Sequence, residues 1–250
     1  MFNESHSLNS LDLTNFKTHN VRNMKAMFSH CVLLSSLNLS TFNTGNVTDM
    51  SSMFYNCWGL TTLDLYNFNT SCVNYMSNMF SYCSSLVSLN LNSFNTSNVT
   101  DMENMFSNCS SLTNLDLSSF DVSNVEDMQC MFADCHSLVT LDLSMFRTNS
   151  LCYAHSMFDN CLKLAWVDLK NFNARELSRV DSMFTNCNAL AIISSPILIS
   201  RCDCKIKLIK ATKYGKYDYR IKVKRGKLKD YIPKILLTIT SGVIGYEEVD

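Results

Sequence analysis

The hydrophobic positions of this chain recur at a fixed spacing along most of its length. A shift of 26 aligns the first 195 residues without insertion or deletion, stacking one column of phenylalanine, one of cysteine and one of Met-Phe pairs. Such self-similarity indicates a repeat architecture, in which each coil buries its apolar face only against its neighbours. The chain is therefore predicted to form a stack of seven coils. The phenylalanine column comprises Phe16, Phe42, Phe68, Phe94, Phe120, Phe146 and Phe172.

Each repeat contains the motif L-x-x-L-x-L, whose last three residues alternate inward and outward. This alternation is typical of a short β-strand. Stacked coils would place these strands side by side in parallel, about 4.8 Å apart. We therefore predict an α/β, mostly β, solenoid of leucine-rich-repeat type. Its parallel strands are expected to centre near residues 12, 38, 64, 90, 116, 142 and 168.

The other half of each repeat, V-T-D-M-x-x-M-F-x-x-C, allows two interpretations. Val47, Met50, Met53, Phe54 and Cys57 fit one face of a helix, and they fit equally a short extended piece followed by a helical turn. A full helix would need three turns opposite a very short strand. We therefore favour an extended piece at V-T-D-M and a helical turn at M-F-x-x-C.

The repeat columns decay near residue 195, which predicts a solenoid over residues 1–195 and a separate β-rich unit over 196–250. In the second unit, alternating runs at 205–208 and 217–224 flank Gly215 and predict a β-hairpin, and the apolar run 235–239 predicts a third strand. Met1 and Phe2 fall in the middle of a repeat. An uncovered stacking face at that end would favour end-to-end self-association.

Charge is distributed unevenly between the two predicted units. Residues 1–195 contain 8 Lys/Arg and 16 Asp/Glu, whereas residues 196–250 contain 13 and 6. The basic unit could dock on the acidic one, meet an anionic partner, or simply present a solvated sheet face. No run of 18 apolar residues predicts a membrane span, and the first residues lack the basic and apolar regions of a signal peptide.

Side chains that could carry chemistry do not form a recognisable catalytic pattern. Seven of the twelve cysteines share one column between apolar positions, which favours free buried thiols over disulfides. Cys202 and Cys204 depart from the column, but no second Cys or His pair at zinc spacing accompanies them. The histidines suggest no triad, and no phosphate-binding glycine motif is present. We expect no enzymatic activity, no metal or other cofactor, and no nucleic-acid ligand.

The outward face of the predicted strands is the candidate binding surface. Its middle column is a carboxylate and amide stripe, flanked by hydroxyls. Stacked aspartates repel one another, so the stripe either recruits a cation or basic partner or is simply solvated. A tryptophan in a column of small polar residues suggests a contact residue. The candidate residues are Asp64, Tyr66, Asp116, Asp142, Trp166 and Asp168.

The stretch from Asn46 to Thr70, N-V-T-D-M-S-S-M-F-x-N-C-x-x-L-T-T-L-D-L-x-x-F-N-T, resembles the 26-residue repeat of BspA-like bacterial surface proteins. The resemblance extends from residue 1 to about residue 195. It implies a secreted or cell-surface protein that binds host or neighbouring-cell molecules, protein or glycan, without enzymatic activity. The alternative is an intracellular scaffold for one partner protein, which would fit reduced cysteines and the missing signal peptide.

Overall fold

The computed structural model of the chain describes residues 1–173, 177–179 and 181–190, and the strands at 192–194, 212–214, 218–224 and 245–249. The chain divides into two compact units, residues 1–204 and 205–250, and each is described by itself. The boundary predicted after residue 195 lies outside the described residues.

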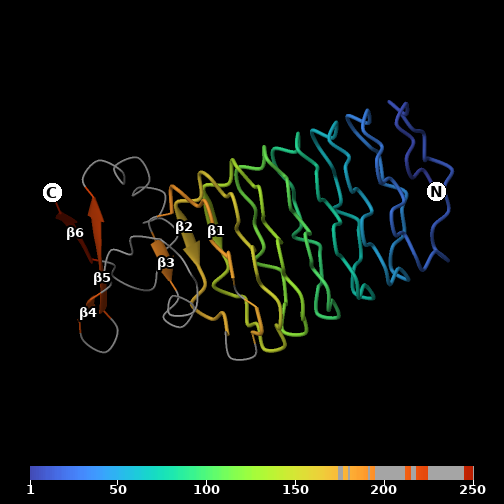
Figure 1. The fold of residues 1–250 in the computed structure, drawn as a ribbon. Coiled ribbons are helices and arrows are strands. Elements are labelled where there is room, and N and C mark those ends of the chain that lie inside the picture. The colour runs from blue at the N-terminus through green and yellow to red at the C-terminus, as the bar shows by residue number, and fades with distance from the viewer. Residues whose placement is uncertain are drawn as a thin grey trace. The chain divides into compact units, whose positions relative to one another are not determined.

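The first unit is a succession of coils, one for each sequence repeat (Figure 1). Parallel bridges join residues of the same repeat column from coil to coil. The bridged residue of each coil occupies the aspartate position of V-T-D-M. The extended piece predicted at this motif is therefore confirmed. The bridged residues are Asn23, Asp49, Tyr75, Asp101, Asp127, Tyr153 and Arg179.

Backbone hydrogen bonds join each coil to the next along the segment that follows this bridge. Alternate N–H groups point along the stack and donate to carbonyls of the following coil, over 2.8–3.0 Å in the coil that contains Phe54. The N–H groups between them close tight turns by donating to carbonyls three positions back, as Met53 does to Met50. The four donors of this coil that reach the next coil are residues 50, 52, 54 and 56.

These tandem turns replace the helical turn that was predicted, and that prediction is wrong. Two residues of the segment have a positive φ in each coil, for example 57° at Ser52 and 55° at Asn56. Single left-handed residues interrupt a right-handed helix. A helix would also direct these N–H groups to carbonyls four positions back and so remove them from the neighbouring coil.

The core of the unit is built from the repeat columns themselves. The phenylalanine of each Met-Phe pair stacks on its equivalents in the adjacent coils, and Phe54 and Phe80 are 5.7 Å apart with rings 7° from parallel. Both rings are fully buried. The stack continues from Phe2 to Phe184 with centroid separations of 5.2–5.7 Å. One coil alone would leave these rings exposed, so their burial depends on stacking.

A buried threonine column links the coils at a second corner. The Thr70 hydroxyl donates to the carbonyl of Asn95 and accepts the N–H of the same residue, both over 2.8 Å. The hydroxyls of Thr18 and Thr44 make equivalent pairs two coils and one coil earlier. These threonines are at most 4% exposed, so each buried hydroxyl is satisfied as donor and as acceptor by a peptide group of the next coil.

The cysteine column is buried, as the sequence predicts. Each of its thiols donates to the carbonyl of a phenylalanine in the preceding coil, for example Cys83 to Phe54 over 3.2 Å. All seven cysteines are free and at most 8% exposed. Burial raises the pKa of the Cys83 and Cys135 thiols to about 12. These side chains therefore stay protonated near neutral pH.

Parallel strands form at only part of the predicted positions. Strands β1 (Thr140–Asp142), β2 (Trp166–Asp168) and β3 (Ile192–Ser194) pair in parallel, each residue opposite its equivalent in the next repeat, which confirms the prediction near residues 142 and 168. The described backbone forms no strand near residues 12, 38, 64, 90 and 116. Single, longer hydrogen bonds join the coils on this side, such as Thr61 to Ser35 over 3.2 Å, and they do not make a continuous ladder.

The second unit contains a three-stranded sheet. Strand β4 (Thr212–Tyr214) pairs antiparallel with β5 (Asp218–Lys224), which confirms the strand predicted at 217–224 but gives it 212–214 as its antiparallel partner, not the predicted 205–208. The third strand is β6 (Gly245–Val249), parallel to β5. The strands predicted at 205–208 and 235–239 lie outside the described residues. Among the described residues of the whole chain, no helix has the length and hydrophobicity needed to cross a bilayer.

The left-handed positions lead to a prediction about stability. Ala26 has a φ of 53°, whereas Lys25 beside it does not have a positive φ. Ala26→Gly should raise the free energy of unfolding by about 0.5–1 kcal/mol, because glycine adopts this conformation without a Cβ clash. Lys25→Gly should lower it, and urea unfolding measures both. A loss of stability in Ala26→Gly as large as in Lys25→Gly would contradict the tandem-turn geometry.

The thiol column leads to a second prediction. At pH 8, iodoacetamide should modify exposed Cys72 roughly a hundredfold faster than buried Cys83 or Cys135, because the reaction needs an accessible thiolate. In urea the three should react alike. Peptide mapping by mass spectrometry separates the sites, and rapid labelling of Cys83 in the folded protein would refute the packing of the column.

Candidate functional site

The aspartate and asparagine stripe on the L-x-x-L-x-L side has a structural role in every coil. One side-chain oxygen accepts the N–H of the residue two positions later, from Asp116 to Ser118 over 2.9 Å and from Asn38 to Ser40 over 3.0 Å. The other five members do the same within 2.9–3.0 Å. This is an Asx turn, for which either residue type serves. Because either side chain can accept this N–H, the stripe contains both Asp and Asn.

Two further corners of the coil use the same device. The Asn95 side chain accepts the N–H of Ser97 over 3.1 Å, and the Asp101 side chain accepts that of Glu103 over 2.9 Å. Asx turns thus replace the glycine and proline that most turns require, which explains a chain with only 6 glycines and 2 prolines. Because Asp and Asn are interchangeable in these turns, the charge of each corner can vary without loss of the turn.

Most residues of the predicted binding stripe are accessible. Asp64, Asp116 and Asp142 are exposed, and Tyr66 is 73% exposed. The N–H of Ser118 holds the pKa of Asp116 below its ordinary value.

Asp168, at the end of the stripe, is half-buried. Burial raises its pKa, the charge of Asp142 adds to the rise, and the N–H and charge of Lys170 oppose it. The structure therefore places an array of negative charge on this face that becomes less solvated towards β2.

The prediction that Trp166 is an exposed contact residue is wrong. Its side chain is only 4% exposed, in a strand that is paired on both sides. The outward column to which it belongs becomes more buried along the stack, from exposed Asn114 through half-buried Thr140 to Trp166. Its indole N–H has no hydrogen-bond partner among the described residues. The ring therefore contributes to packing at this end of the unit and is not available to a ligand.

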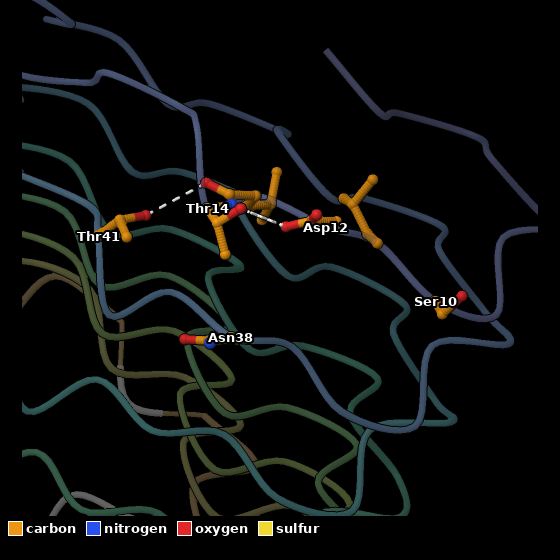
Figure 2. Close-up of a pocket in the computed structure, with 7 residues that line it drawn as sticks. Ser10, Asp12, Thr14, Asn38 and Thr41 are labelled. Atoms are coloured by element: carbon orange, nitrogen blue, oxygen red, sulfur yellow. Dashed lines mark hydrogen bonds between the residues drawn. The ribbon is translucent and has the colours of Figure 1, made fainter.

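A pocket of about 360 Å³ opens at the first member of the stripe (Figure 2). Within it, the Thr14 hydroxyl donates to Asp12 over 2.8 Å and the Thr41 hydroxyl donates to the Leu13 carbonyl over 3.2 Å. Asp12 is the single titratable side chain of the lining, so the pocket offers polar contacts but no acid and base pair. The lining residues are Ser10, Leu11, Asp12, Leu13, Thr14, Asn38 and Thr41.

A second polar surface lies on the tandem-turn side, and sequence reasoning missed it. Tyr75, Asp101, Asp127 and Tyr153 occupy the bridge column in four consecutive coils. The two tyrosines are 49% and 43% exposed, and the two aspartates are half-buried. The signal that could have revealed it is the replacement of Asp by Tyr in this column. We call these four side chains the Tyr-Asp row.

Among the described residues, Glu103, Asp127 and Asp159 have no ion-pair partner, and the pKa of each is raised. The pKa of Glu103 is raised by burial and by the charges of Asp127 and Asp101. The pKa of Asp127 is raised mainly by burial, with a further contribution from Asp101 and an opposing one from His155. The pKa of Asp159 is raised in the same way, by burial and by Asp134. Within the described part of the chain, no group of three Asp, Glu, His or Cys side chains is arranged to hold a metal ion.

Comparisons with known proteins identify a family and one similar structure. A family described as "Mycoplasma protein of unknown function, DUF285" matches residues 1–111 and 83–194. The crystal structure of a leucine rich cell surface protein from Faecalibacterium prausnitzii A2-165 is 19% identical, with a TM-score of 0.29, over 72% of this chain and 46% of that chain. The present chain thus spans less than half the length of that protein. No curated protein matched.

The Asx turns lead to a prediction at Asp116. Asp116→Ala should lower the free energy of unfolding by about 1 kcal/mol, because the N–H of Ser118 loses its acceptor. Asp116→Asn should keep the turn, as Asn38 and Asn90 do. Since folding lowers the pKa of Asp116, its charge stabilises the fold above the unfolded pKa of about 3.9, and this contribution is lost as the pH falls.

Urea unfolding at pH 7 and pH 3 tests both parts of this prediction. Asp116→Asn should lose less stability than wild type on going to pH 3. If Asn and Ala were equally destabilising at pH 7, the side chain would act through its charge and not through the turn.

Proposed function

The chain belongs to the family described as Mycoplasma protein of unknown function, DUF285, and for this member we propose a non-enzymatic binding or adhesion function. It presents an extended repeat surface to a protein or a glycan. The observation that carries the proposal is the fixed array of outward side chains, which backbone hydrogen bonds hold one coil apart. Such preorganisation reduces the entropy lost when a surface binds its ligand.

We further propose that the stack is a solenoid of leucine-rich-repeat type and that it acts at the cell surface or outside the cell. The resemblance of residues 46–70 to the repeat of BspA-like surface proteins supports this location. End-to-end self-association of the array stays a prediction. Protease treatment of intact cells tests the location, because a surface protein is cleaved there and an intracellular scaffold is not.

The contact surface is proposed to include the exposed stripe residues Asp64, Asp116 and Asp142 and the neighbouring, exposed Tyr66. The triple variant Asp64→Asn, Asp116→Asn, Asp142→Asn removes three charges and keeps every Asx turn. We expect it to bind roughly tenfold more weakly than wild type to a ligand found by screening immobilised extracellular proteins and glycans. Surface plasmon resonance measures the affinities, and urea unfolding verifies that the fold is retained.

A matched control removes three exposed charges elsewhere. The variant Glu4→Gln, Asp121→Asn, Glu126→Gln should bind like wild type. Equal weakening in both triple variants would show that net charge, not the stripe, determines binding. A complete absence of saturable ligands in the screen would refute the proposed function itself.

A further inference from the structure

We propose that the Tyr-Asp row binds a lysine- or arginine-rich polypeptide segment. This inference rests on the proposed binding function and names a partner class for a second surface of the same stack. It starts from exposed aromatic side chains that the core does not use, beside carboxylates that the chain does not neutralise.

The geometry places two carboxylates between two phenol rings. Tyr75 pairs with Asp101, Asp101 with Asp127, and Asp127 with Tyr153 as Cα partners in parallel bridges. Neighbouring positions of this kind are about 4.8 Å apart, so the row is about 14 Å long. Both tyrosines are more than two-fifths exposed and can offer ring faces to a ligand.

The carboxylates of the row remain available to a cation. One oxygen of Asp101 accepts the N–H of Glu103, and one oxygen of Asp127 accepts that of Gln129. Within the described residues, no hydrogen bond or ion pair reaches the second oxygen of either aspartate. Each therefore has a free acceptor on a half-buried, negatively charged surface.

The chain supplies little positive charge to the aspartates of the row, and Arg179, the bridge partner of Tyr153, pairs with Asp181. Residues 26–146 contain ten Asp or Glu and no Lys or Arg. Among the described residues, Arg179 pairs with Asp181 over 3.3 Å, and His136, which is charged only when protonated, lies 3.5 Å from Asp134. Burial and, to a lesser extent, repulsion between neighbouring carboxylates raise the pKa values of Asp127 and Glu103, and a cation brought by a partner would offset the repulsion.

The combination of residue types indicates a basic polypeptide. Tyrosine rings attract ammonium and guanidinium groups through cation–π contacts, and aspartates form charge-assisted hydrogen bonds with the same groups. A row of about 14 Å suits several side chains of an extended segment, which rises about 3.3 Å per residue. A segment of this composition occurs in the sequence of the chain itself. Residues 219–229 contain six Lys or Arg among eleven residues, so their charge is complementary to that of the row.

The probe for the experiment is a fluorescent peptide with the sequence of residues 219–229, added to the full chain. Fluorescence anisotropy should show saturable binding that weakens as salt rises. The variant Asp101→Asn, Asp127→Asn should bind roughly tenfold more weakly. It should fold normally, because Asn23 makes the same Asx turn in this column, to the N–H of Lys25 over 2.8 Å. Tyr75→Ser with Tyr153→Ser should weaken binding severalfold through loss of the ring faces.

Two controls distinguish the row from general electrostatic attraction. Asp64→Asn with Asp116→Asn removes the same charge from the stripe and should leave the peptide affinity within twofold of wild type. A peptide with glutamine at all six basic positions should not bind. Equal loss in both Asp double variants, wild-type affinity in the Tyr variant, or no binding at low salt would each overturn the inference.

The outcome for this surface is separable from that of the proposed function. If the chain binds a ligand from the screen but not the basic peptide, the inference about the Tyr-Asp row alone fails. If no ligand from the screen binds, the proposed function fails by its own test.

Discussion

Backbone hydrogen bonds between successive coils are the interaction on which this structure depends. Alternate N–H groups of the tandem turns reach carbonyls of the following coil, so a peptide group in one coil is satisfied only when the next coil is in place. The same constraint appears in the side chains, since the Thr70 hydroxyl and the Cys83 thiol also satisfy peptide groups of neighbouring coils. Stacked phenylalanines then fill the space that these bonds enclose. No coil is expected to fold alone.

This arrangement separates the fold from the surface. The inward columns and the hydrogen bonds along the stack fix the coil, whereas the corners need only an oxygen acceptor, which either Asp or Asn supplies. Charge and aromatic groups can therefore be distributed over the corners at little cost to stability. The stripe and the Tyr-Asp row are two such distributions, and both leave negative charge that the repeats do not neutralise.

Much of this architecture could be predicted from the sequence, because shifting the chain by one repeat aligns identical residue types. The coil length and the buried columns, including Cys83 and Phe54, follow from that alignment. The tandem turns could not be predicted, since polar residues such as Ser52 and Asn56 give no periodic signal for a positive φ. Trp166 was misjudged because its burial depends on its place near the end of the stack. Tyr75 and Tyr153 were overlooked because they depart from their column.

Native-state hydrogen exchange of the backbone amides tests most directly whether these bonds hold the coils together. We expect strong protection of Asn78 and Phe80, whose N–H groups donate to Glu103 and Met105 of the next coil over 2.7 and 2.9 Å. We expect weaker protection at Thr61, whose N–H donates to Ser35 over 3.2 Å on the side that has no continuous ladder, because local opening costs less there. Exchange of Asn78 and Phe80 at the rate of an unfolded chain, in the folded protein, would contradict this dependence on the bonds between coils.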